Sequence, residues 1–117
     1  MPANYTYVPD LLKEARIPET GCLSRTLHND DELRILIYGF ATGEELADHF
    51  SPTAAVLHFL EGEAEVTING DQMSAKAGTL IHMSPNLSHG IIARTPLIMV
   101  QTLLKLTRVA MDNADMT

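Results

Sequence analysis

Four of the five histidines fall within one stretch, residues 43–93, in which short apolar segments alternate with glycine turns. The turns are Glu-Gly-Glu at 61–63, Asn-Gly-Asp at 69–71 and Ala-Gly-Thr at 77–79. Asn-Gly between two apolar segments is a strong signal for a β-hairpin, because both residues accept positive φ angles. The stretch therefore predicts short strands of one barrel, whose two halves each bring a histidine towards a shared interior.

Strand patterns continue on both sides of this stretch. Strands are expected over 22–28, 33–41, 54–60, 64–68, 79–83, 88–94 and 97–106, with a turn at 29–32. Residues 41–48 and 71–78 are expected to form a polar loop and an exposed connection, and residues 9–17 a short helix. Because closure hides strand edges, many short strands with tight turns predict an all-β sandwich or barrel with a short N-terminal helix.

The length and charge limit the classes of protein that fit. A chain of 117 residues is expected to form one domain, with a barrel core at about 22–107 and a polar, disordered tail at 108–117. The net charge of -7 argues against a nucleic-acid surface, and no apolar run reaches the ~20 residues of a membrane span. Cys22 is the single cysteine, which fits a reducing, cytoplasmic location.

Two spacings resemble those of the cupin family, which has a jelly-roll barrel also described as a double-stranded β-helix. The family's first motif is a glycine, five residues, His-x-His, three or four residues, Glu, six residues and a glycine. Gly43, His49 and Gly62 match it. The second motif is a glycine, five residues, Pro-x-Gly, two residues and His, which Gly78 opens and His89 closes. The resemblance implies a single cupin domain with His49 and His89 in one pocket.

The chain departs from both motifs at other positions. Ser51 stands at the second histidine and Ala55 at the glutamate of the first motif, while Ser84 and Asn86 replace the proline and glycine of the second. The family's metal is usually held by three histidines and one glutamate, so the resemblance leaves two ligands here.

A divalent transition metal such as Zn, Fe, Mn or Ni takes three or four N, O or S ligands, so two imidazoles need a further donor. His82 and Gln101 are the candidates; His82 has no predicted facing, and Gln101 lies either in the cavity or at a solvated edge. Strand alternation turns His58 away from the pocket, so it is expected to be a packed or an interface residue on the other face of the strand. His28 lies beside the predicted turn at 29–32 and is expected to be a surface residue.

The remaining pocket is expected to be apolar. Its predicted residues are Ser51, Leu57, Phe59, Leu80, Ile91 and Met99. Neither motif core contains a lysine or arginine, which disfavours a polyanionic ligand.

Three functions remain open. One is a barrel that binds a small organic ligand, or a weakly held metal, without turnover. The second is a metal-dependent enzyme of the dioxygenase, isomerase or decarboxylase type. The third is a chiefly structural homodimer, with an interface at strand 97–106 and His58.

Overall fold

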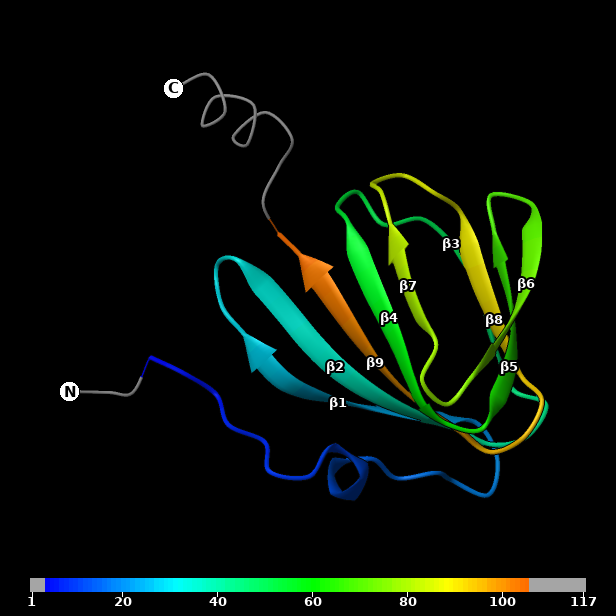
Figure 1. Ribbon diagram of the computed structural model, residues 1–117, viewed down its shortest axis with the longest axis horizontal. Coiled ribbons are helices and arrows are strands. Elements are labelled where there is room, and N and C mark those ends of the chain that lie inside the picture. The colour runs from blue at the N-terminus through cyan, green and yellow to red at the C-terminus, as the bar shows by residue number, and fades with distance from the viewer. Residues whose placement is uncertain (1–3, 106–117) are drawn as a thin grey trace.

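The computed structural model describes residues 4–105, which form two antiparallel sheets (Figure 1). The large sheet has the strand order β1-β2-β9-β4-β7 and the small sheet β3-β8-β5-β6. The strands are β1 (Cys22–Asn29), β2 (Leu33–Phe40), β3 (Glu45–His49), β4 (Ala55–Glu61), β5 (Glu63–Ile68), β6 (Asp71–Lys76), β7 (Leu80–Met83), β8 (His89–Ala93) and β9 (Leu97–Leu104).

The predicted all-β jelly roll is confirmed, but two of its strands were missed. Residues 41–48 were expected to form a loop, yet Glu45–His49 is β3; residues 71–78 were expected to form a connection, yet Asp71–Lys76 is β6. β3 has exposed side chains at four of its five positions, and β6 at four of its six. Their polar composition therefore hid strands that pair through their backbones.

The short helix predicted over residues 9–17 is reduced to a single turn. Only a 3₁₀ turn, η1 (Leu11–Glu14), forms, and Asp10 caps it by accepting a hydrogen bond from the backbone of Leu12. The segment is short and ends near Pro18, so packing rather than helix propensity decides its conformation. Its side chains Leu11, Ala15 and Ile17 lie against an apolar cluster on the outer face of the large sheet.

The turns follow the local chemistry of their residues. Asn69 and Gly70 have φ angles of 51° and 90° between β5 and β6, which confirms the Asn-Gly hairpin. In the turn before β2, Asp30 accepts backbone hydrogen bonds from Glu32 and Leu33. A side-chain hydrogen bond from His28, together with these backbone bonds, lowers the pKa of Asp30 to about 2. The acidic run 30–32 therefore begins with a capped turn.

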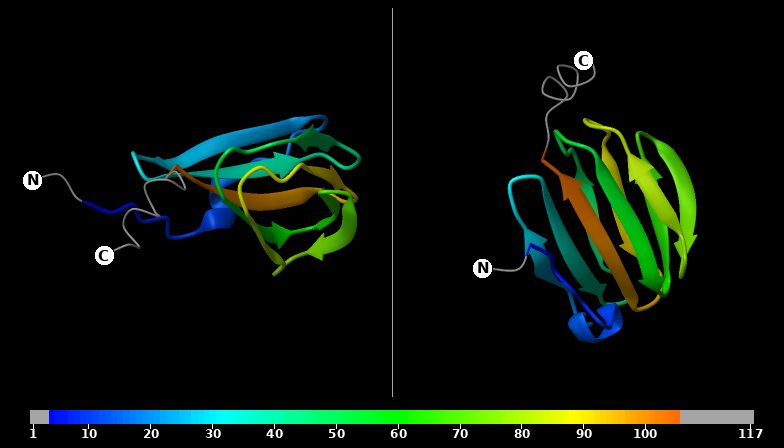
Figure 2. Two further views of the ribbon diagram at one scale, coloured as in Figure 1. Left: turned by 90° about the horizontal axis from the view of Figure 1, so that it is seen from above. Right: turned by 60° about the vertical axis from the view of Figure 1, so that its left-hand side comes forward.

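The core lies between the facing sides of the two sheets, which we call the inner faces (Figure 2). β4 shows the alternation clearly: Ala55, Leu57 and Phe59 are buried, while His58 is exposed. On the large sheet, Leu57 pairs with Gln101 and Phe59 pairs with Met99, so all four belong to the same inner face.

β9 occupies the middle of the large sheet, between β2 and β4. Its inner side chains, Leu97 and Met99, join the main core. Its outer side chains, Ile98 and Val100, belong to the cluster that the N-terminal segment packs against. Residues 97–101 are therefore buried by the chain itself, so this part of the expected dimer surface on strand 97–106 is not available to a partner.

Within residues 4–105, no helix has the length and hydrophobicity needed to cross a bilayer. The predicted polar tail at 108–117 lies outside the described residues.

Candidate functional site

His49 and His89 come together at one end of the small sheet. They are register partners in the antiparallel pair β3–β8, and their ring centroids are 4.2 Å apart with an interplanar angle of 57°. The expected meeting of these two rings is therefore present in the structure. His89 is buried, with 2% of its surface exposed, whereas His49 is exposed at the rim. The pair thus lies at the mouth of the barrel rather than in a closed interior.

A β-bulge turns His49 towards the inner face. Leu46 pairs with Ile91 and His49 pairs with His89, so two residues of β3, Ala47 and Asp48, lie opposite the single residue Gly90. Strict alternation from the inward-facing Leu46 would place His49 on the outer face, because three positions separate them. The additional residue reverses that alternation and brings the two imidazoles together.

The two histidines are held in the same way by their own backbones. Nδ1 of His49 donates to the carbonyl of Ala47 at 2.9 Å, and Nδ1 of His89 donates to the carbonyl of Leu87 at 3.3 Å. A carbonyl oxygen only accepts, so each Nδ1 carries the hydrogen and each neutral ring has its lone pair on Nε2. Nε2 of His89 is buried and has no hydrogen-bond partner among the described residues.

Burial lowers the pKa of His89 below its usual value of 6.5; a weaker contribution from the neighbouring His49 acts in the same direction. The unfolded chain therefore binds a proton at a pH where folded His89 does not. The free energy of unfolding should therefore fall as the pH decreases from about 6.5 to the pKa of His89 in the folded protein. In this range the unfolded chain binds more protons than the folded chain.

Urea unfolding between pH 7.5 and pH 5 measures this effect. We expect His89→Gln to flatten the pH dependence of the unfolding free energy relative to the natural chain. An equal slope in both proteins would show that His89 titrates alike in the folded and unfolded chains.

Gln101 is the second buried polar side chain among the described residues, with 4% exposure. Its burial on the inner face excludes the alternative of a solvated edge. The Tyr38 hydroxyl donates to Gln101 Oε1 at 3.0 Å, and Tyr38 lies on β2 of the same sheet. Tyr38 was not among the predicted site residues. Its position two residues from both Leu36 and Phe40, on the same face of the strand, was the signal that could have placed it on the inner face.

His82 and Leu80 do not face the interior, which corrects two predictions. On β7, His82 pairs with Val56 and Leu80 pairs with His58, both on the outer face of β4. Both β7 residues are exposed, Leu80 at 64%. Ile81 is partly buried and Met83 is buried; these two face inward on β7.

The remaining predicted pocket residues fall into two groups. The first group lies in the buried core cluster of the inner faces: Leu57, Phe59, Ile91 and Met99. Two of its members, Ile91 and Met99, are the next inward-facing residues along their strands from His89 and Gln101. Ser51 lies on the loop after β3, where its Oγ donates to the carbonyl of Thr53 at 2.9 Å. Its carbonyl accepts from Asn86 at 2.8 Å, which joins the two loops near the mouth.

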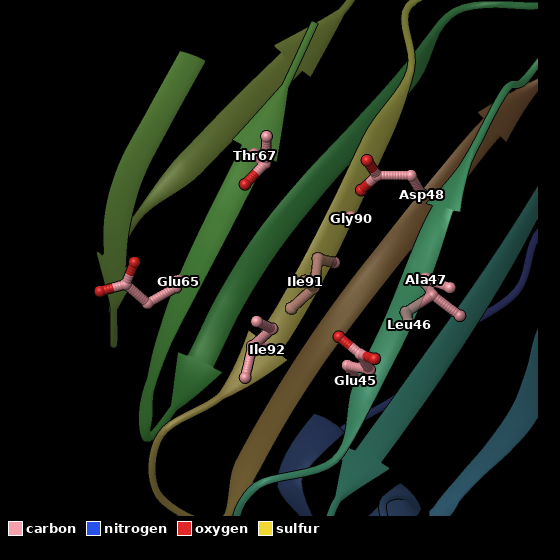
Figure 3. A pocket seen from close by; sticks show the side chains of 9 residues that line it. All are labelled: Glu45, Leu46, Ala47, Asp48, Glu65, Thr67, Gly90, Ile91 and Ile92. Atoms are coloured by element: carbon pink, nitrogen blue, oxygen red, sulfur yellow. The ribbon is translucent and has the colours of Figure 1, made fainter. Parts of the chain in front are cut away.

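A separate surface depression of about 450 Å³ lies over β3, β8 and β5 (Figure 3). Its polar side chains, Glu45, Asp48, Glu65 and Thr67, are on the outer face of the small sheet, whereas the histidine pair is on the inner face. Across residues 4–105, no three histidine, cysteine, aspartate or glutamate side chains converge as a metal site. The histidine pair is therefore the best-formed candidate centre.

Known proteins share this architecture. A family model described as a cupin domain matches residues 36–103. A conserved protein of unknown function from Streptococcus pyogenes is 30% identical, with a TM-score of 0.79 over 89% of this chain and 91% of that chain. A cupin superfamily protein from Desulfitobacterium hafniense is 22% identical, with a TM-score of 0.78 over 89% and 94%. An RmlC-like cupin from Shewanella frigidimarina is 24% identical, with a TM-score of 0.71 over 77% and 81%. No curated protein matches the chain.

Proposed function

Because the chain belongs to the cupin family, we propose that its barrel binds a small organic ligand beside the His49–His89 pair, and that the pair can also hold a divalent transition metal. The buried Nε2 of His89 is the observation that supports this proposal. A buried acceptor without a partner costs about 1–3 kcal/mol, so a bound group that donates to it, or a cation, would recover that cost.

The arrangement of the rings fits a metal in part. A metal-binding histidine usually donates its other ring N–H to a carbonyl or carboxylate, as both histidines do here. The described residues supply two imidazoles and no converging third ligand, so Zn, Fe, Mn or Ni would need oxygen donors from water or from the ligand. A metal held there would polarise an oxygen of the bound molecule.

The apolar walls determine what else can bind. Leu57, Phe59 and Ile91 belong to one buried apolar cluster on the inner faces, which carry the two buried polar side chains. Apolar pockets with few polar groups take small organic molecules and orient them through those groups. This supports a binding module more than a metal-dependent dioxygenase, isomerase or decarboxylase, which would need a firmer hold on its metal than two imidazoles give.

Metal content tests the metal part of the proposal. The untagged protein is purified, reconstituted with Zn²⁺, Mn²⁺, Fe²⁺ or Ni²⁺, desalted and measured by mass spectrometry. We expect near-stoichiometric metal, lost in the double variant His49→Ala/His89→Ala. The matched control is His58→Ala/His82→Ala, which removes two exposed imidazoles from the outer face. Equal metal in both double variants, or none in the natural chain, would exclude a metal on this pair.

Ligand binding is tested separately on metal-free protein. A panel of small alcohols, amides and amines is screened by thermal shift, and each compound that binds is measured again on His89→Phe, which keeps a ring without nitrogen. We expect roughly tenfold weaker binding, the cost of one buried hydrogen bond. Unchanged affinities in His89→Phe would place the ligand elsewhere.

A homodimer remains a prediction. His58 and Leu80 form an exposed part of the large sheet's outer face where a partner could pack. Light scattering measures the mass directly.

A further inference from the structure

The two buried polar side chains of the described chain face one interior from opposite sheets. His89 lies on β8 of the small sheet and Gln101 on β9 of the large sheet. Their inner-face neighbours, Ile91 beside His89 and Met99 beside Gln101, belong to the same core cluster. Burying an amide costs free energy wherever one of its polar atoms lacks a partner, and the hydrogen bond from Tyr38 reaches only Oε1 of Gln101. The placement of Gln101 therefore calls for an explanation beyond packing.

Tyr38 fixes which end of the Gln101 amide is free. Its hydroxyl donates to Oε1, so the carbonyl oxygen of the amide is occupied. The amide nitrogen carries two N–H donors, and the bond to Tyr38 leaves both for another acceptor. Across the interior, His89 offers an acceptor at Nε2. The inner faces of the two sheets thus carry a donor on Gln101 and an acceptor on His89.

We propose that Gln101 recognises a carbonyl oxygen of the ligand, so that the ligand is a small neutral carbonyl compound with a neighbouring hydrogen-bond donor, such as a carboxamide, a lactam or a hydroxyketone. The inference rests on the proposed function, because the ligand's donor is the group that His89 accepts. A carboxylate fits less well, since it has only acceptors for His89 and loses more hydration on burial.

Three probes with the same carbon chain separate these contacts by calorimetry on metal-free protein at pH 7.5. Hexanamide has a carbonyl and a donor, hexan-1-ol has a donor without a carbonyl, and hexanoate has acceptors only. We expect hexanamide to bind roughly tenfold more tightly than either of the others, the effect of one buried hydrogen bond. Hexanamide that fails to bind, or binds no better than hexan-1-ol, overturns the inference.

Variants assign the selectivity to Gln101. Gln101→Met keeps the side-chain volume but removes the donor. The affinity for hexanamide should therefore fall roughly tenfold, while the affinity for hexan-1-ol stays unchanged. Gln101→Glu replaces the donor with an acceptor and should weaken hexanamide at least as much. Tyr38→Phe releases the orienting bond and should weaken hexanamide alone. Gln72→Met is the control: it makes the same Gln-to-Met change at an exposed position of β6 and should leave the affinities for all three probes unchanged.

The outcomes separate this inference from the proposed function. If His89→Phe weakens the probes but Gln101→Met leaves the hexanamide to hexan-1-ol ratio unchanged, the ligand site stands and recognition by Gln101 is wrong. If Gln101→Met weakens all probes equally, Gln101 has a packing role and the inference is also wrong. Thermal melting of each variant confirms that the protein tested is folded.

Discussion

Replacing Gly62 with alanine should destabilise the protein by roughly 3–5 kcal/mol, the combined cost of backbone strain and of overpacking. Gly62 joins β4 to β5 and has a φ of 90°, where a side chain is strained. A Cβ there would collide with the carbonyl oxygen of Pro96 and press on Thr95 Oγ1. Thr95 Oγ1 accepts from the backbone of Glu63 at 2.9 Å, so this turn cannot move away freely.

Gly78→Ala is the matched control for this prediction. Its φ is 96°, but a Cβ at that position has open space around it. It should therefore show only the conformational cost, about 1–2 kcal/mol. Urea unfolding at pH 7.5 measures both variants. If the two substitutions cost the same, the close approach of Pro96 contributes nothing to the role of Gly62.

Replacing Phe59 with alanine should cost about 3–5 kcal/mol, because it leaves a cavity in the core as well as losing buried apolar surface. Phe59 is fully buried and pairs with Met99 across β4 and β9. The adjacent residue provides the control: His58→Ala, on the exposed face of the same strand, should change stability by about 0.5 kcal/mol or less. If Phe59→Ala costs no more stability than a typical surface substitution, the core around Phe59 is loosely packed.

Most of the fold was predictable because apolar alternation and turn residues act locally. The strand around Leu57 and Phe59 was identified from its composition, and the Asn69-Gly70 hairpin from its turn chemistry. β3 and β6 were missed because their side chains carry little apolar signal. Their place in the small sheet is set by backbone pairing with β8 and β5, which a local pattern does not contain.

The site was predictable where two motif spacings gave long-range information. They identified His49 and His89, while alternation along β3 alone would have turned His49 outwards. The facing of His82 and Leu80 was not accessible, because it depends on which residues of β4 they pair with. Gln101 was weighed as an interior residue, but its orientation by Tyr38 joins positions 63 residues apart and has no local signature.

The central position of β9 has a consequence for the order of events during synthesis. β9 follows every other described strand in sequence, yet it joins β2 to β4, pairing Leu33 with Leu104 and Phe59 with Met99. A growing chain that stops before residue 97 has two separate halves of the large sheet. Such distant pairings close slowly, on a scale of about milliseconds to seconds. The core between the two sheets would therefore be completed only after β9 has left the ribosome.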